Sequence, residues 1–163
     1  MQQLPDTRFA PLVRTLRVEI SPRDFHPRML CAFNAQSRPE VPAEVRLAHY
    51  FETVRHWLAP ALRKFVNVRT LHLTTTYDGM KMDLISKNEL MIPCFETLCN
   101  VVRKAELSKL EELQLGLPYY GGYGDFFQLG SHRRTLKNVS KSIRTATIKL
   151  YDYHDNFTIM PIF

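Results

Sequence analysis

The sequence lacks features that mark several classes of protein. No apolar run approaches the roughly 18 residues that a bilayer span requires, and residues 1–8 have neither the basic start nor the apolar stretch of a secretory signal. The chain has three cysteines, which cannot all pair, and a chain of 163 residues needs no disulfide to hold its core. We therefore expect an intracellular protein, cytoplasmic or nuclear, with reduced thiols and no membrane partner.

Patterns typical of catalytic and cofactor sites are also missing. The glycine-rich segment 121–124 lacks the lysine and hydroxyl residue that follow in a phosphate-binding P-loop. Cys94 and Cys99 have a spacing that diverges on a helix, and His49 and His56 have no companion ligand. Neither a Gly-x-Ser-x-Gly motif nor a His-Glu-x-x-His motif is present. The sequence thus predicts a protein that is not an enzyme and that holds neither a metal nor a cofactor.

One short pattern, apolar-x-x-apolar-x-apolar, is written four times. The four copies lie at residues 13–20, 68–75, 110–117 and 143–150. In each copy, alternation sends the last two apolar side chains to one face of a β-strand and the residues between them to the other face. The first apolar residue is expected to anchor the turn that enters the strand. The sequence therefore predicts four strands with one common facing.

Amphipathic helices are predicted between these strands. Apolar residues recur at three- and four-residue steps over 45–62, where Pro60 is expected to end or kink the helix. A second apolar face over 91–102 follows the capping-box spacing of 86–89, and a third, short candidate spans 131–142. Strands joined by crossover helices should be parallel, with the helices on the opposite side. We therefore predict an α/β fold in which residues 1–163 form a single domain.

A strand motif of this form, preceded by an amphipathic helix and repeated at irregular spacing, resembles the leucine-rich repeats of fungal F-box proteins. The segments 68–73 and 110–115 carry most of the likeness, which covers residues 11–155. The resemblance implies a short irregular leucine-rich-repeat-like solenoid, with a parallel sheet on one side and helices on the other. It also implies a protein-protein interaction module, the substrate-recognition part of a ubiquitin-ligase receptor.

This chain departs from the family pattern in three ways. The asparagine or cysteine that follows each strand of a regular repeat is missing, and Ala146 stands where a leucine is expected. No F-box is visible, so the adaptor-binding half of such proteins is not carried over. Because a repeat buries its faces only against its neighbours, the apolar tail 159–163 either folds back as a cap or belongs to a fragment of a longer protein.

The outward positions of the four strands predict a binding face. Solenoids usually bind their partners on such a face, because neighbouring strands place these side chains in rows. The predicted central row is Arg17, His72, Gln114 and Thr147. The flanking rows are Thr15, Thr70, Glu112 and Thr145, and Glu19, Thr74, Gly116 and Lys149. We predict that the central row contacts a partner protein, and the alternative is a merely solvated sheet face.

A glycine-punctuated loop over 119–127 adds an aromatic cluster to this prediction. Tyrosine is enriched at binding hot spots because its large, rigid ring loses little entropy on binding. Tyr119, Tyr120 and Tyr123 are therefore predicted to contact the partner. The structural alternative is that Phe126 and Phe127 tuck beneath the loop as part of the core.

A basic run near the C-terminus supports a second hypothesis, a nucleic-acid-associated protein. The chain has a formal net charge of +6, and the run contains Arg133, Arg134, Lys137 and Lys141. On a helix, residues 133, 137, 141 and 144 would share one face and could follow phosphates. The alternative for this stripe is the solvated side of an amphipathic helix.

Overall fold

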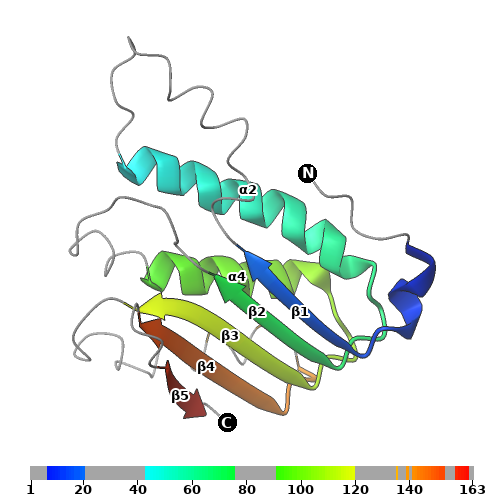
Figure 1. Cartoon of the computed structure of the whole chain (residues 1–163). Coiled ribbons are helices and arrows are strands. Elements are labelled where there is room, and N and C mark those ends of the chain that lie inside the picture. Colours follow the sequence, from blue (N-terminus) through cyan, green and yellow to red (C-terminus); the bar gives the residue numbers. More distant parts are fainter. Residues whose placement is uncertain are drawn as a thin grey trace.

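The computed structural model describes residues 7–20, 43–75, 91–119, 135, 139, 141–152 and 157–161. Within these residues the elements follow the order η1, β1, α2, β2, α4, β3, β4 and β5. The chain is an α/β protein with a five-stranded sheet, as Figure 1 shows. None of the described helices is long and apolar enough to cross a membrane.

Four of the strands are parallel and lie side by side in chain order. They are β1 (Thr15–Ile20), β2 (Thr70–Thr75), β3 (Glu112–Tyr119) and β4 (Thr145–Asp152). The predicted parallel arrangement is therefore confirmed. A fifth strand, β5 (Phe157–Pro161), pairs with β4 in the antiparallel direction, which agrees with the expectation that the apolar tail folds back.

Both long helices cover the same face of the sheet (Figure 1). They are α2 (Ala43–Arg63) and α4 (Met91–Ala105), and they pack against each other. The short 3-10 helix η1 (Thr7–Leu12) precedes β1. The capping-box residues 86–89 and most of the segment 131–142 lie outside the described residues.

Of the two effects predicted for Pro60, to end or to kink the first helix, the first is wrong. Pro60 is exposed and lies inside α2, which continues to Arg63. A proline costs a helix one backbone hydrogen bond. The helix continues because Leu58, Ala59 and Leu62 are buried in the hydrophobic core, so their packing outweighs that cost.

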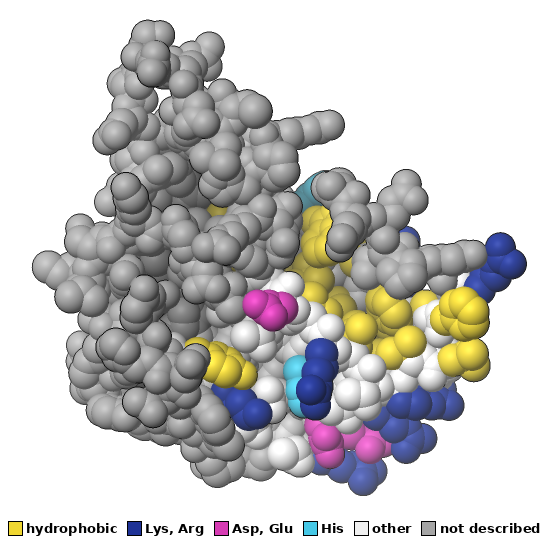
Figure 2. Space-filling model, in the orientation of Figure 1, with side chains coloured by type: hydrophobic (Ala, Val, Ile, Leu, Met, Phe, Trp, Pro, Cys, Tyr) yellow, Lys and Arg dark blue, Asp and Glu magenta, His cyan; other side chains and the backbone are white. Residues whose placement is uncertain are grey.

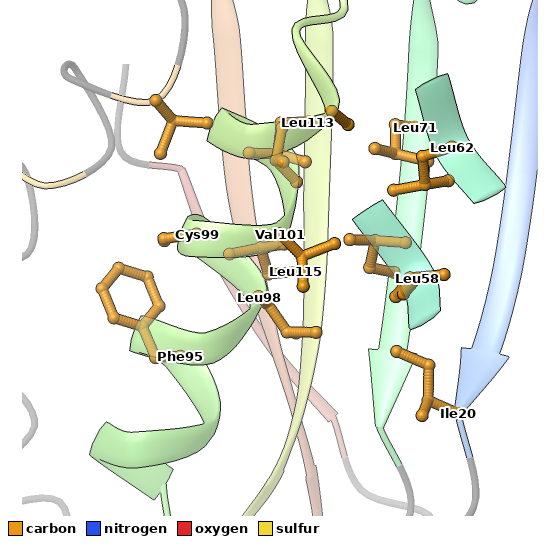
Figure 3. Packing of buried hydrophobic residues seen from close by; sticks show 14 of the residues in the cluster. Ile20, Leu58, Leu62, Leu71, Phe95, Leu98, Cys99, Val101, Leu113 and Leu115 are labelled. Carbon is orange, nitrogen blue, oxygen red and sulfur yellow. The ribbon is translucent and has the colours of Figure 1, made fainter. Parts of the chain in front are cut away.

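The core lies between the sheet and the two helices. The inward side chains of the central strands are completely buried, and Figure 3 shows Leu98 and Val101 of α4 turned toward them. The largest fully buried side chains of the sheet, its turns and the helices are Leu58, Leu62, Leu71, Leu73, Phe95, Leu98, Leu110, Leu113, Leu115, Leu117 and Ile148. Each of them stabilises the fold by about 1.5–3 kcal/mol relative to an exposed side chain.

The first strand is less well covered than the others. Leu16 pairs in register with Leu71, and Val18 pairs with Leu73. Leu71 and Leu73 have no exposed surface, whereas Leu16 and Val18 are only partly buried. The difference arises because β1 is the edge strand of the sheet and has a neighbour on one side only.

A repeated turn leads into the first three strands. The backbone N–H groups of Val13, Val68 and Leu110 each donate to the carbonyl three residues earlier, at 3.3, 3.1 and 3.2 Å. These are the first apolar residues of the sequence pattern, and Val68 and Leu110 are buried. The next residue in each turn is Arg14, Arg69 or Glu111. Its carbonyl accepts two N–H groups, from the first residue of the following strand in the sheet and from the residue just before that strand. The same backbone connection therefore recurs across the sheet.

Candidate functional site

The face of the parallel sheet opposite the helices carries the predicted binding residues. Arg17, His72, Gln114 and Thr147 are cross-strand partners, so the central row is continuous across all four strands. Arg17 is exposed, and the other three are partly exposed. Figure 2 shows basic, acidic and uncharged side chains next to one another on the described part of the molecule. The predicted central row is thus confirmed as a row, and its contact with a partner stays a prediction.

The row nearest the start of the strands is also continuous. Thr15, Thr70, Glu112 and Thr145 are in register, and the Thr70 hydroxyl donates to Glu112 Oε2 at 3.2 Å. Glu112 is exposed and keeps lone pairs for further donors. This row therefore presents hydroxyl and carboxylate groups beside the central row.

His72 lies in the middle of this face, where its charge is disfavoured. Burial lowers the pKa of His72 below 6.5, and the positive charges of Arg17 and Lys149 lower it further, while Glu112 opposes them. The imidazole is therefore uncharged at neutral pH. A neutral imidazole has one donor and one acceptor nitrogen, so the central row carries a charged guanidinium next to a neutral hydrogen-bonding ring.

Gly116 allows two side chains from neighbouring strands to meet above β3. A Cβ atom at this position would lie 2.7 Å from Thr74 Oγ1 and 2.7 Å from Tyr151 Cε2. The Tyr151 ring therefore lies over the glycine, on the same face as the predicted rows. Sequence reasoning did not select Tyr151. The signal that could have found it is the glycine inside a strand, which marks a close approach by another group.

Of the three tyrosines predicted to contact a partner, the structure describes only the first. Tyr119 is the last residue of β3, and its backbone is paired with Asp152. Tyr120, Tyr123, Phe126 and Phe127 lie outside the described residues, so contact of the aromatic loop with a partner stays a prediction.

The predicted basic helix is described at isolated positions only. Arg133, Arg134 and Lys137 lie outside the described residues. Lys141 is exposed just before β4, and Arg144 is exposed immediately before the first residue of that strand. The structure therefore places these two basic residues at the edge where the strands begin.

A cavity of about 250 Å³ lies beside α4, away from the sheet face. Its lining includes Glu96, Cys99, Arg103 and Thr135. Burial raises the pKa of the Cys99 thiol to about 12, so the sulfur stays protonated and is a poor nucleophile. Among the described residues, no three His, Cys, Asp or Glu side chains converge on a point that could hold a metal ion.

Comparisons with protein-family models, with curated proteins and with solved structures give no match for this chain.

Proposed function

We propose that this chain is a short leucine-rich-repeat-like solenoid that binds another protein through the central row of its sheet face. By its resemblance to the repeats of fungal F-box proteins, the bound protein is the substrate of a ubiquitin ligase. The observation that carries the proposal is the sheet itself: four parallel strands in register have both long helices on one face.

Among the described elements no helix lies on the second face of the parallel sheet, which is unusual. Parallel sheets normally have helices on both faces, and repeat proteins are the arrangement in which one face stays available for a partner. Here the exposed fractions of Arg17, Glu19, Glu112 and Tyr151 leave their side chains accessible to a partner. The face is therefore built from residues whose backbone the sheet holds in place and whose side chains are exposed or partly exposed.

The chemistry of the face suits a protein better than a small ligand. It combines a guanidinium, carboxylates, amide and hydroxyl groups over four strands, and an interface between proteins uses such a mixture around a few anchors. Arg17 and Tyr151 are of the residue types that dominate binding energy. The described rows extend across four strands and so offer a broad surface.

The test uses two double variants with matched changes. In the first, Arg17→Ala and Gln114→Ala remove the tips of the central row. In the second, Glu52→Ala and His56→Ala shorten two exposed side chains of α2 on the opposite side of the molecule. Proteins captured from a lysate by the unchanged chain are identified, and the leading candidate is purified and titrated against all three chains.

We expect the central-row variant to weaken binding by at least about tenfold, because each anchor of hot-spot type contributes 2 kcal/mol or more. The helix variant should bind like the unchanged chain. If the helix variant loses the partner while the central-row variant keeps it, the proposed face is wrong. The ubiquitin-ligase assignment is tested separately, by asking whether the purified partner is ubiquitinated in cells only when the central row is intact.

A further inference from the structure

Basic residues gather at the edge of the molecule where the strands begin and the helices end. We call this the basic edge and define it by Arg14, Arg63, Arg69, Lys109, Lys141 and Arg144. All of them lie in the turns before the four parallel strands or at the last residue of α2. The acidic residues of the same turns and strand starts, within the described part of the chain, are Glu106, Glu111 and Glu112. Positive charge is therefore in excess along this edge.

Three of these cations occupy equivalent positions of the repeat. Arg14, Arg69 and Arg144 each directly precede the first residue of a strand, and Glu111 takes that position before β3. The shared carbonyl connections join these four positions in order. Neighbouring strands are about 4.8 Å apart, so the line spans about 14 Å across the sheet. The cations thus form a row across the fold, although they are far apart in the sequence.

Several of these cations are held by neutral groups. Arg63 donates to the carbonyl of Lys104 at 2.7 Å, and Arg14 donates to the carbonyl of Asn67 at 3.4 Å. Lys109 Nζ donates to Asn67 Oδ1 at 2.6 Å. A neutral acceptor fixes the position of a cation without cancelling its charge. These side chains are therefore oriented and still attract an anion.

Carboxylates neutralise few of the positive charges that the described residues place at this edge. Among the described residues, the ion pair recorded there joins Arg69 and Glu111, with an N···O distance of 3.7 Å and both side chains well exposed. An exposed pair of this kind contributes about 0–1 kcal/mol. An incoming phosphate can therefore compete with Glu111 for the Arg69 guanidinium.

Stabilisation of the helix ends does not explain the whole edge. A cation near the last turn of a helix interacts favourably with the helix dipole, which accounts for Arg63 and for Arg103 and Lys104 of α4. Arg14 and Arg144 directly precede strands and belong to neither α2 nor α4. Their placement needs another explanation.

We infer that the basic edge binds the phosphate backbone of single-stranded nucleic acid. The planar guanidinium forks of Arg14 and Arg144 fit phosphate oxygens in pairs, and a row of cations across the sheet suits a strand with a regularly repeated charge. Phe9 and Leu12 of η1, just before β1, are 68% and 72% exposed. An exposed phenylalanine next to a basic surface offers a ring on which an unpaired base can stack.

This inference is independent of the proposed protein-binding face. The central row lies in the middle of the sheet, whereas the basic edge lies in the turns at the strand starts. The sequence analysis placed nucleic-acid binding on a basic helix near the C-terminus, and the inference places it on the basic edge instead. Lys141 and Arg144 belong to both the predicted basic face and the basic edge, and the other four cations of the edge come from elsewhere in the chain.

The test is a titration of the full chain against fluorescein-labelled oligo(dT) and oligo(U) of 20 nucleotides at several NaCl concentrations. The variant carries Arg14→Gln, Lys109→Gln and Arg144→Gln, which removes charge and keeps hydrogen-bonding ends. The control carries Arg17→Gln and Lys149→Gln on the sheet face, which removes two positive charges away from the basic edge. Circular dichroism confirms that each variant is folded before it is titrated.

We expect the unchanged chain and the control to bind with a steep salt dependence. Each phosphate contact contributes about 0.7 to the slope of log K against log salt for a single strand. Loss of three contacts in the edge variant should therefore lower the slope by about 2. Phe9→Ser should weaken binding further without changing the slope, because stacking releases no counterions.

Three outcomes would overturn the inference. The first is that the control loses affinity as strongly as the edge variant, which would assign binding to the sheet face. The second is that polyglutamate binds as tightly as the oligonucleotides, which would assign the edge to acidic proteins. The third is that vesicles with 30% phosphatidylserine bind through Phe9 and Leu12 while the oligonucleotides do not, which would assign the edge to a membrane surface.

Discussion

Shortening Leu71 to alanine should destabilise the chain strongly, because this side chain has no exposed surface. It lies on a central strand, paired with Leu16 on one side and Leu113 on the other. Removing a fully buried leucine side chain costs the lost transfer free energy plus the free energy of the remaining cavity, together about 3–5 kcal/mol. For a chain of 163 residues, a loss of this size lowers the melting temperature by roughly 10 °C.

Leu16→Ala is the matched comparison, because it changes the same residue type at the same register position one strand away. Leu16 is only partly buried at the sheet edge, so water can fill much of the space that the shorter side chain leaves. We expect a loss of about 1–1.5 kcal/mol. His72→Ala, on the adjacent position of β2 but on the opposite face, should cost less than about 1 kcal/mol.

Urea unfolding followed by far-ultraviolet circular dichroism measures all three variants. The loss of unfolding free energy should be smallest for His72→Ala, larger for Leu16→Ala and largest for Leu71→Ala. Equal losses for Leu16→Ala and Leu71→Ala would refute the argument that β1 is an uncovered edge. A larger loss for His72→Ala than for Leu71→Ala would mean that the facing of β2 is reversed.

Three further predictions concern single positions. Gly116→Ala should destabilise the chain by about 1–2 kcal/mol, because the new methyl group meets the Tyr151 ring at 2.7 Å; unfolding of the double variant with Tyr151→Ala should recover part of the loss. The pKa of His72, followed by NMR, should lie below 6.5, chiefly through burial, and Arg17→Gln should raise it part of the way. Because this lowered pKa makes the unfolded state bind the proton more tightly, the contribution of His72 to stability is lost as the pH falls from 6.5 toward its folded pKa. Cys99, as the only cysteine of a variant, should react with a thiol reagent at pH 8 only after unfolding, because burial raises its pKa to about 12.

The strand arrangement could be predicted from the sequence because alternation is strict in all four copies. A shift of one residue would move every inward leucine to the outer face, so the pattern leaves one register that buries them all. The rows through Arg17 and Glu112 follow from that register, and the structure confirms both. Local pattern and tertiary packing agree here, which is why the prediction succeeds.

The misses come from interactions that a linear pattern does not contain. Pro60 breaks the local rule for helix interiors, yet burial of its neighbours keeps α2 intact to Arg63. The role of Gly116 depends on a ring from the next strand, and that contact is invisible in either segment alone. The basic edge is assembled from turns far apart in the chain, so only the register of the strands brings Arg14 and Arg144 into one row.

The strands lie in the sheet in the same order as in the sequence. This order affects how such a protein can evolve. Within the described sheet, each parallel strand pairs with the strands next to it in the sequence. Duplication of one strand-helix unit would therefore widen the polar surface by a single column and create one new junction. The other junctions would stay as they are, so the footprint offered to a partner can grow or shrink by whole units without redesign of the interior.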